Sequence, residues 1–111
     1  MGDDTKTESH WFVYMLHCDD GSLYTGITTD LTRRLVEHND NKLGARYTRA
    51  RRPVKLAWFE RCETRSHASV REAEIKKLDR NQKKLLITLS WKKYKSAFRK
   101  AGADQTVLGN L

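Results

Sequence analysis

Residues 11–28 read WFVYMLHCDDGSLYTGIT, and this stretch decides the fold. Residues 11–16 are aromatic, β-branched or large and apolar, a pattern typical of a strand that is buried on both faces. Residues 22–28 are rich in side chains that favour a second strand. The Asp20-Gly21 dipeptide between the two segments is a strong turn signal. The stretch therefore predicts an antiparallel β-hairpin.

The length of the turn fixes which side chains of the hairpin face each other. If residues 19–21 form a three-residue loop, Tyr14 pairs with Gly26 and Tyr24 pairs with Leu16. The two tyrosines are then diagonal neighbours on one face, with Cα atoms roughly 7–8 Å apart. A slip of one residue would place the two hydroxyls on opposite faces. Gly26 leaves room for a phosphate beside Tyr14, so we favour a functional pair over two tyrosines that only pack at a core edge.

The chain after the hairpin begins with a helix signal and then a long irregular segment. Thr29 and Asp30 are good N-caps for a helix that runs to about residue 39. Residues 39–53 hold turn formers and basic side chains, which predicts a long loop with a short helical piece. A loop of this length favours a functional role. Residues 54–62 predict the third strand.

Three further helices are expected after the third strand. They cover residues 66–78, 79–87 and 90–100, and the first two are capped by Ser66 and Asp79. In the last of them the aromatic residues Trp91, Tyr94 and Phe98 follow the spacing of a packing stripe. The final ten residues are expected to fray.

The element order β-β-α-β-α-α predicts an α+β fold, with helices flanking a small three-stranded antiparallel sheet. A chain of 111 residues has room for one modest core. We divide it into a disordered leader at residues 1–9, a folded domain at residues 10–88, and a basic C-terminal helix and tail at residues 89–111.

The chain is basic, with 22 Lys and Arg against 14 Asp and Glu and a net charge of +8. Such an excess favours a polyanionic partner, because phosphates neutralised by Lys and Arg release their counterions. An anionic membrane surface and a merely soluble basic surface are the competing interpretations. No apolar run approaches the roughly 20 residues that a membrane-spanning helix needs. The polar N-terminus resembles neither a secretory signal nor a myristoylation site, so we expect a cytoplasmic protein without a membrane partner.

The cysteine content points to a reducing compartment. Cys18 and Cys62 are the only two cysteines, and they lie far apart in the sequence. A secreted domain of this size usually carries more, so we expect two reduced, partly buried thiols. The four scattered histidines and the lack of a close cysteine pair argue against a zinc site.

Arg34 and His38 are four residues apart on an expected helix, so they share a face. A guanidinium suits a phosphate in the transition state, because it offers fixed donors and keeps its charge. Arg33 beside it is expected to face solvent or to contact a nucleic-acid backbone. His38 has two interpretations of equal weight: an active-site helper, or a helix-end histidine stabilised by the C-terminal dipole.

Glu72 lies at the margin of the apolar side of its expected helix, which carries Ala68 and Ile75. Mg²⁺ often accepts one or two carboxylates and keeps water in the rest of its coordination shell. We therefore expect Glu72 to hold one divalent ion, Mg²⁺ or Mn²⁺, that can polarise a phosphoryl oxygen. The alternatives are an ion pair with Lys76 and a metal bound by Glu74 instead.

Basic side chains gather between residues 33 and 55, with an aromatic ring and a hydroxyl among them. The expected nucleic-acid contacts are Arg33, Arg46, Tyr47, Thr48, Arg49, Arg51 and Arg52. Contacts with the phosphate backbone would position a substrate without reading its sequence. A solvated charge run is the alternative, which we disfavour because the segment adjoins the expected catalytic face.

Taken together, the tripeptides FVY and YTG, the Arg34 and His38 pair and the later Glu72 resemble the GIY-YIG nuclease domain. The small stand-alone YhbQ-type members of that superfamily are the most similar, and in them GARYTR, as at residues 44–49, is a recurring signature. The resemblance runs from about residue 11 to about residue 87. It implies a small antiparallel sheet flanked by helices and the cutting of nucleic-acid phosphodiesters.

The resemblance also implies roles for single residues. It makes Arg34 the catalytic arginine and Glu72 the metal ligand, and His38 matches a position that holds His or Tyr in relatives. Either Tyr14 or Tyr24 would act as general base or orient the attacking water, and the resemblance slightly favours Tyr14 as the base.

The sequence departs from some nucleases of the superfamily at two positions. Those nucleases carry a lysine just after the second motif, where this chain has Ile27, and an asparagine where it has Lys84. We expect a metal-dependent endonuclease that hydrolyses DNA and is structure-directed or nonspecific. The alternative is a noncatalytic module on the same fold that binds DNA or structured RNA.

Overall fold

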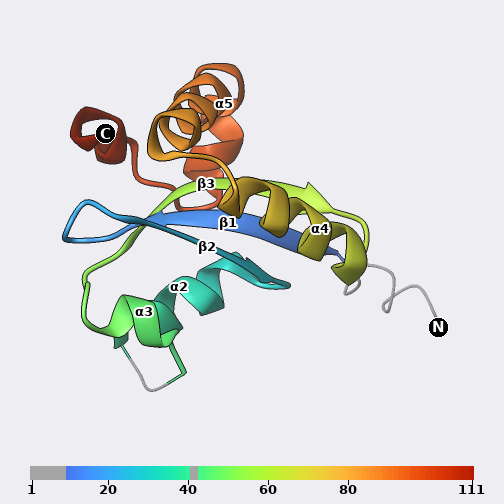
Figure 1. The fold of residues 1–111 in the computed structure, drawn as a ribbon, viewed down its shortest axis with the longest axis horizontal. Helices are drawn as coiled ribbons and strands as arrows, with labels where there is room; N and C mark the ends of the chain where they lie inside the picture. The colour runs from blue at the N-terminus through green and yellow to red at the C-terminus, as the bar shows by residue number, and fades with distance from the viewer. Residues whose placement is uncertain (1–9, 41–42) are drawn as a thin grey trace.

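A three-stranded antiparallel sheet organises the computed structural model, which describes residues 10–40 and 43–111 (Figure 1). The elements are β1 (Trp11–His17), β2 (Leu23–Thr28), α2 (Leu31–Asp40), α3 (Arg46–Arg49), β3 (Lys55–Cys62), α4 (Arg65–Lys76), α5 (Arg80–Lys100) and the 3₁₀-helix η1 (Gln105–Asn110). The strand order is β2-β1-β3, so the first strand is central. The predicted α+β class is confirmed. The expected leader at residues 1–9 lies outside the described residues.

The central strand β1 is buried on both faces, as its composition predicts. Val13, Tyr14, Met15 and Leu16 are each 2% exposed or less. Successive side chains of a strand point to opposite faces. Val13 and Met15 accordingly join one apolar cluster, and Tyr14 and Leu16 join another.

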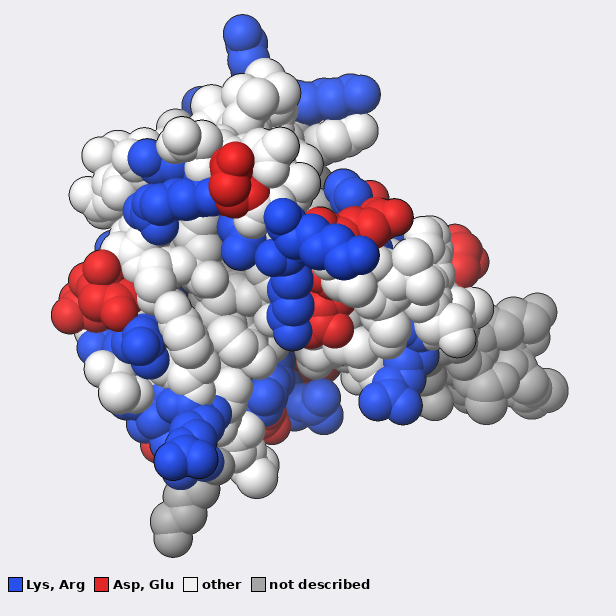
Figure 2. Space-filling model, viewed as in Figure 1, with Lys and Arg blue, Asp and Glu red and all other residues white. Residues whose placement is uncertain are grey.

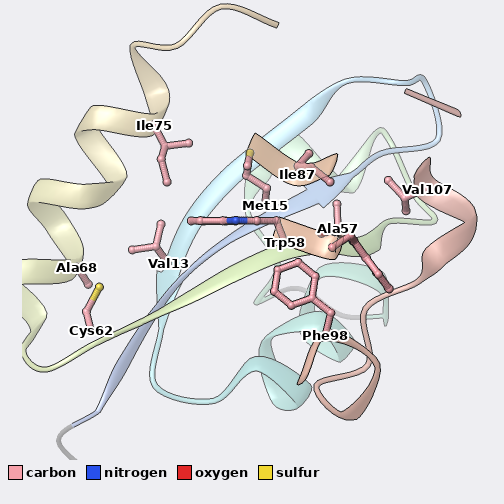
Figure 3. Close-up of a cluster of buried hydrophobic side chains, with 11 residues drawn as sticks. Val13, Met15, Ala57, Trp58, Cys62, Ala68, Ile75, Ile87, Phe98 and Val107 are labelled. Atoms are coloured by element: carbon pink, nitrogen blue, oxygen red, sulfur yellow. Dashed lines mark hydrogen bonds between the residues drawn. The ribbon is translucent and has the colours of Figure 1, made fainter. Parts of the chain in front are cut away.

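Helices α4 and α5 cover the Val13 face of the sheet and form the larger cluster with it. Figure 3 shows Ile75 of α4 and Ile87 of α5 over the sheet residues Val13 and Met15. Full burial of one such side chain contributes about 1.5–3 kcal/mol. This face therefore supplies most of the apolar stabilisation of the fold.

Helices α2 and α3 lie on the other side of the sheet from α5 (Figure 1). Leu31 and Leu35 of α2 pack against the smaller cluster, which contains Tyr14 and Leu16. The predicted short helical piece within residues 39–53 is confirmed as α3. The candidate site is built between these two short helices and the tyrosine face of the sheet.

The hairpin turn has the predicted length. The amide of Cys18 donates to the carbonyl of Ser22 at 2.9 Å, and the amide of Gly21 donates to the carbonyl of Cys18 at 2.9 Å. Gly21 adopts φ +86°, a left-handed conformation that glycine accepts without strain. The Asp20 carboxylate accepts from the backbone and hydroxyl of Ser22 at 3.0 and 2.6 Å. The turn thus sets the register of the two tyrosines.

The helix caps agree with the sequence in two cases and differ in one. Asp30 accepts a backbone hydrogen bond in the first turn of α2, and Asp79 forms a capping box at the start of α5. The prediction that Ser66 caps α4 was wrong. Thr64 does so, accepting from the His67 amide at 3.1 Å, because the strand ends early enough for α4 to begin at residue 65.

The C-terminal region corrects three expectations. The two helices predicted at residues 79–87 and 90–100 form one element, α5, since no Gly or Pro separates them. Trp91 and Phe98 are buried as a packing stripe predicts, but Tyr94 has non-helical angles and is 51% exposed. The last residues do not fray, because η1 buries Val107 completely against the sheet cluster.

Basic side chains form several separate groups on the face shown in Figure 2, with uncharged surface between them. They gather over the α2–α3 region and over α5, with smaller acidic groups between them. Cys18 and Cys62 are free and buried. No helix within residues 10–40 and 43–111 is long and apolar enough to cross a bilayer.

Candidate active site

Tyr14 and Tyr24 lie on the same face of the hairpin. Tyr14 pairs with Gly26 and Tyr24 pairs with Leu16 in the ladder between β1 and β2. The centroids of the two phenol rings are 6.4 Å apart. The register predicted from the three-residue turn is therefore confirmed, and both rings lie beside His38 of α2.

Gly26 lies in close contact with the Tyr14 side chain. A Cβ atom at this position would stand 2.6 Å from the Tyr14 hydroxyl oxygen and 2.8 Å from the ring carbon that bears it. Both separations are well inside van der Waals contact. Gly26 is thus needed for the Tyr14 ring to lie flat across β2.

Replacing Gly26 with alanine should displace the Tyr14 ring and lower the free energy of unfolding by about 1–3 kcal/mol, the usual effect of overpacking a buried site. Urea denaturation of the two proteins measures this difference. Gly109→Ala is the matched control, because nothing lies within 4 Å of a Cβ at that position. Equal stability of the Gly26 and Gly109 variants would contradict the close packing described.

His38 links Tyr14 of β1 to Thr48 of α3 through hydrogen bonds. Its Nε2 atom lies 2.8 Å from the Tyr14 hydroxyl, and its Nδ1 atom lies 2.8 Å from the Thr48 hydroxyl. The His38 and Thr48 side chains are completely buried, and Tyr14 is 2% exposed. Three polar side chains therefore form one buried row of hydrogen bonds.

Burial shifts the pKa values of both Tyr14 and His38. Burial is the main reason that the pKa of Tyr14 rises to about 12 and that the pKa of His38 falls to about 4, and the charge of Arg34 contributes to the fall of the His38 value. Both groups are uncharged at neutral pH. The helix-dipole interpretation of His38 needs a charged imidazole, so the structure does not favour it.

Neutral His38 should make the fold sensitive to acid. Its pKa falls from 6.5 to about 4 on folding. Its contribution to stability is therefore present above pH 6.5 and is lost as the pH falls toward 4. The shift corresponds to about 3 kcal/mol. Urea denaturation between pH 7.5 and 4 should show this loss in the wild type.

The His38→Gln variant is the control for this prediction, and its stability should depend less on pH over the same range. Burial also lowers the pKa of His17, but that residue is present in both proteins and cancels in the comparison. Identical pH dependence of the two proteins would rule out a buried neutral His38.

Arg34 projects from α2 toward the Tyr14 hydroxyl. Its Nη1 atom donates to the Glu37 carboxylate at 2.8 Å and to the Leu43 carbonyl at 2.7 Å. Burial alone would lower the pKa of Arg34, but hydrogen bonds to Glu37 and Tyr14 outweigh it and raise the pKa. The guanidinium stays charged, and 24% of the side chain remains exposed.

Glu72 approaches the same site from α4. Its side chain is 22% exposed, and its negative charge is among the groups that raise the Tyr14 pKa. The ion pair with Lys76 offered as its alternative role is also present, at 3.1 Å. Glu74, the rival carboxylate, is 59% exposed and pairs with Arg71. Ala68 and Ile75 of the same helix are buried, as expected.

The chain matches the model of a known protein family. The family model described as the GIY-YIG catalytic domain matches residues 10–85, which include β1, β2, α2 and α4. The chain belongs to the GIY-YIG family. The resemblance inferred from the two tyrosine motifs is therefore confirmed.

Curated relatives of this GIY-YIG protein carry the name UPF0213. One from Desulfotalea psychrophila is 51% identical over 88 residues, 79% of this chain and 80% of the relative. Another from Clostridium perfringens is 54% identical over 77 residues, 69% of this chain and 82% of the relative. A solution NMR structure of the UPF0213 protein from Bacillus halodurans is 41% identical, covers 72% of this chain and 84% of its own, and superposes with a TM-score of 0.48.

The residues of this GIY-YIG site can offer one carboxylate to a divalent ion. Within residues 10–40 and 43–111 no three His, Cys, Asp or Glu side chains gather at one point. Glu72 offers one partly exposed carboxylate, and Mg²⁺ or Mn²⁺ readily combines one carboxylate with water and substrate oxygens.

The basic segment of the GIY-YIG site divides into two groups. Arg51 donates to the Asp20 carboxylate at 2.9 Å, and Arg52 donates to the carbonyl of His38. These two arginines therefore hold the loop against the hairpin and α2. The exposed members are Arg33, Arg46 and Arg49. Phosphate contacts by any of them remain a prediction.

Thr48 corrects the sequence interpretation. The basic segment predicts a nucleic-acid contact at Thr48, but its side chain is fully buried and its hydroxyl faces His38. A buried hydroxyl cannot reach a phosphate backbone. The sequence gives no local signal for this, because Thr48 stands in a four-residue helix whose other members are all exposed.

Tyr47 stacks on the second motif tyrosine. The rings of Tyr47 and Tyr24 are 5.8 Å apart and 28° from parallel, and the Arg51 guanidinium lies 3.9 Å from the Tyr47 ring centroid. Two neighbouring residues of α3 thus contact two rings of the site: Tyr47 stacks on Tyr24, and Thr48 forms a hydrogen bond with His38. The composition of α3 did not predict this role.

Proposed function

We propose that this GIY-YIG protein is a metal-dependent endonuclease that hydrolyses DNA phosphodiester bonds and is structure-directed or nonspecific. One observation carries the proposal: the Tyr14 hydroxyl lies 2.8 Å from Nε2 of His38, and its pKa responds to a hydrogen bond from Arg34 and to the charge of Glu72. Those groups come from one strand and two helices, β1, α2 and α4. An imidazole, a guanidinium and a carboxylate that act on one phenol are groups that phosphodiester hydrolysis can use as base, charge and metal ligand.

Arg34 is the proposed ligand of the scissile phosphate. Charge develops on the phosphate oxygens in the transition state, and a fixed guanidinium in a partly buried site stabilises that charge strongly. Its contacts with Glu37 and Leu43 restrain the side chain before a substrate arrives. The exposed quarter of the side chain is the part available to a phosphate.

Tyr14 is the proposed base for the attacking water. Its pKa of about 12 means that the phenol keeps its proton in the free protein at neutral pH. Neutral His38, 2.8 Å away, can receive that proton as the phenol oxygen takes one from water. The Arg34 hydrogen bond and charge favour the phenolate. Tyr24, on the same face, is placed to orient the water.

Glu72 is the residue that would hold the metal. A bound Mg²⁺ or Mn²⁺ would supply Lewis-acid polarisation of a phosphoryl oxygen and further stabilise negative charge. Lys76 competes for the same carboxylate, so occupation of the site requires that this ion pair open. An exposed ion pair of this kind contributes only a few tenths of a kcal/mol, so its loss costs little.

The basic surface supports a nucleic-acid substrate. Arg33, Arg46 and Arg49 are exposed beside the site, and the chain has a net charge of +8. Contacts of such groups with phosphates position a strand without reading its bases. We therefore propose DNA as the substrate, bound through its backbone.

A cleavage panel tests the proposed function. Labelled duplex, flap, junction, single-stranded DNA and structured RNA are incubated with the protein at fixed salt, with Mg²⁺, with Mn²⁺ or with a chelator. We expect cleavage of DNA that requires the metal. Salt-sensitive binding without cleavage of any substrate would instead identify the noncatalytic module, and preference for structured RNA would replace DNA as the substrate.

A further inference from the structure

The buried hydrogen bonds around Thr48 have a fixed direction. Its Oγ1 atom lies 2.9 Å from the backbone carbonyl of Ala45 and 2.8 Å from Nδ1 of His38. A carbonyl can only accept, and a threonine hydroxyl has a single proton to donate. That proton is committed to Ala45, so the hydroxyl oxygen accepts from the imidazole. The His38 Nδ1 atom therefore carries a hydrogen.

We propose that Thr48 is a positioning residue that holds His38 in the Nδ1–H tautomer and leaves Nε2 as the acceptor for the Tyr14 proton. The inference rests on the proposed function, since it concerns the proposed proton acceptor. A neutral imidazole carries one hydrogen, so hydrogen on Nδ1 leaves a lone pair on Nε2. That lone pair lies 2.8 Å from the Tyr14 oxygen.

The opposite tautomer does not fit the same geometry. A hydrogen on Nε2 would occupy the position at which the Tyr14 proton must arrive. The Nδ1 lone pair would then face the Thr48 oxygen, whose proton points elsewhere. Water cannot relieve this mismatch, because His38 and Thr48 are completely buried.

The backbone of α3 also fixes the orientation of the Thr48 hydroxyl, through the carbonyl of Ala45. The Ala45 carbonyl also accepts from the amides of Thr48 and Arg49 at 3.1 and 3.2 Å, so its direction is set by the first turn of α3. Thr48 is β-branched and has few side-chain rotamers. The acceptor presented to His38 is thus rigid.

Burial and the charged groups around His38 together keep the imidazole neutral at pH 7. Arg34 and Arg52 lower its pKa, Glu37 raises it, and burial has the largest effect, with a result of about 4. Tyr14 and Tyr24 are the other titratable neighbours, with ring centroids 5.9 and 5.3 Å from His38. At pH 7 only the two neutral tautomers therefore compete.

Nitrogen NMR of the imidazole ring at pH 7 tests the proposal on the free protein. We expect a protonated Nδ1 and an unprotonated Nε2 in the wild type and in Thr48→Ser, which keeps the hydroxyl. Thr48→Val should move hydrogen to Nε2 in part of the population. A wild type with hydrogen on Nε2, or an unchanged tautomer in Thr48→Val, would overturn the assignment.

Thr25→Val is the matched control, because the Thr25 hydroxyl is buried on the other face of the sheet with no hydrogen-bond partner among the described residues. It should leave the His38 tautomer unchanged. If Thr48→Val does not fold, the wild-type and Thr48→Ser spectra still decide the question.

Cleavage kinetics give the second readout. Thr48→Val should lower kcat more than it changes KM, by about 10- to 100-fold, the range typical of partners that orient metal-binding histidines. Thr48→Ser should restore most of the rate. A wild type that has the predicted tautomer but cleaves nothing would contradict the proposed function while supporting the orientation by Thr48. Full activity of Thr48→Val would contradict the positioning role.

Discussion

Tyr14→Phe should lower the single-turnover rate of DNA cleavage by about 10²- to 10⁴-fold, the usual contribution of a positioned base. The substitution removes one oxygen atom from a ring that is 2% exposed, so the packing of the ring is retained. It also leaves Nε2 of His38 without its partner. Loss of one buried hydrogen bond costs about 1–3 kcal/mol, which thermal denaturation of the variant should reveal.

The pH profile separates a lost base from a damaged fold. Transfer of the Tyr14 proton to His38 starts from a protonated phenol and a neutral imidazole, and pKa values of about 12 and about 4 make both forms dominant at neutral pH. The wild-type rate should therefore be nearly level around pH 7 and should fall as His38 takes up a proton toward pH 4. Tyr14→Phe should lose this dependence on pH. A variant that keeps both the wild-type rate and the wild-type profile would exclude Tyr14 as the base.

Glu72→Ala should abolish Mg²⁺-dependent cleavage while leaving DNA binding largely intact. A metal contributes several kcal/mol of charge stabilisation in the transition state, which corresponds to a loss of about 10³-fold or more. Binding is spared because the exposed arginines of the α2–α3 region are unchanged. Single-turnover cleavage and salt-dependent DNA binding measure the two properties separately.

The neighbouring carboxylate supplies the control for this second prediction. Glu74 lies on the same helix, is 59% exposed and pairs with Arg71. Glu74→Ala should cleave at the wild-type rate. Lys76→Ala should also remain active, since it removes only the competitor for the Glu72 carboxylate. Metal-dependent cutting by Glu72→Ala, or its loss in Glu74→Ala, would overturn the metal assignment.

The parts of the site that follow local rules could be predicted from the sequence. The turn at Asp20 and Gly21 has a defined length, so it fixed the pairing of Tyr14 with Gly26. Helical spacing likewise placed Arg34 and His38 on one face. Both inferences depend on residues close in sequence, where backbone geometry leaves few choices.

The contacts between distant segments could not be predicted in this way. Thr48 lies in a basic segment typical of a solvated surface, yet its side chain is buried and contacts His38, ten residues earlier in the chain. Asn39 provides another case, since its amide both accepts from and donates to the backbone of Val54, at 2.7 and 3.0 Å. Such pairs join the end of α2 to the start of β3, and no periodicity in the sequence encodes them.

The contacts of Arg51 and Arg52 within the protein also could not be predicted from the sequence. The sequence predicts nucleic-acid contacts for Arg51 and Arg52 as well as for the exposed arginines of the segment. In the structure Arg51 reaches Asp20 in the hairpin turn, and Arg52 reaches the backbone of His38. Charge counts alone cannot separate an arginine that stabilises a loop from one that faces solvent, because both look the same in the sequence.

The most direct test of a single phosphate-cutting site is a crystal structure of Tyr14→Phe with Mg²⁺ and a DNA oligonucleotide. The measured quantity is the distance from the nearest backbone phosphate to the Arg34 guanidinium and to the metal on Glu72. We expect one phosphate to contact both groups beside the ring at position 14. DNA bound to another face, with neither group near a phosphate, would contradict a shared active site.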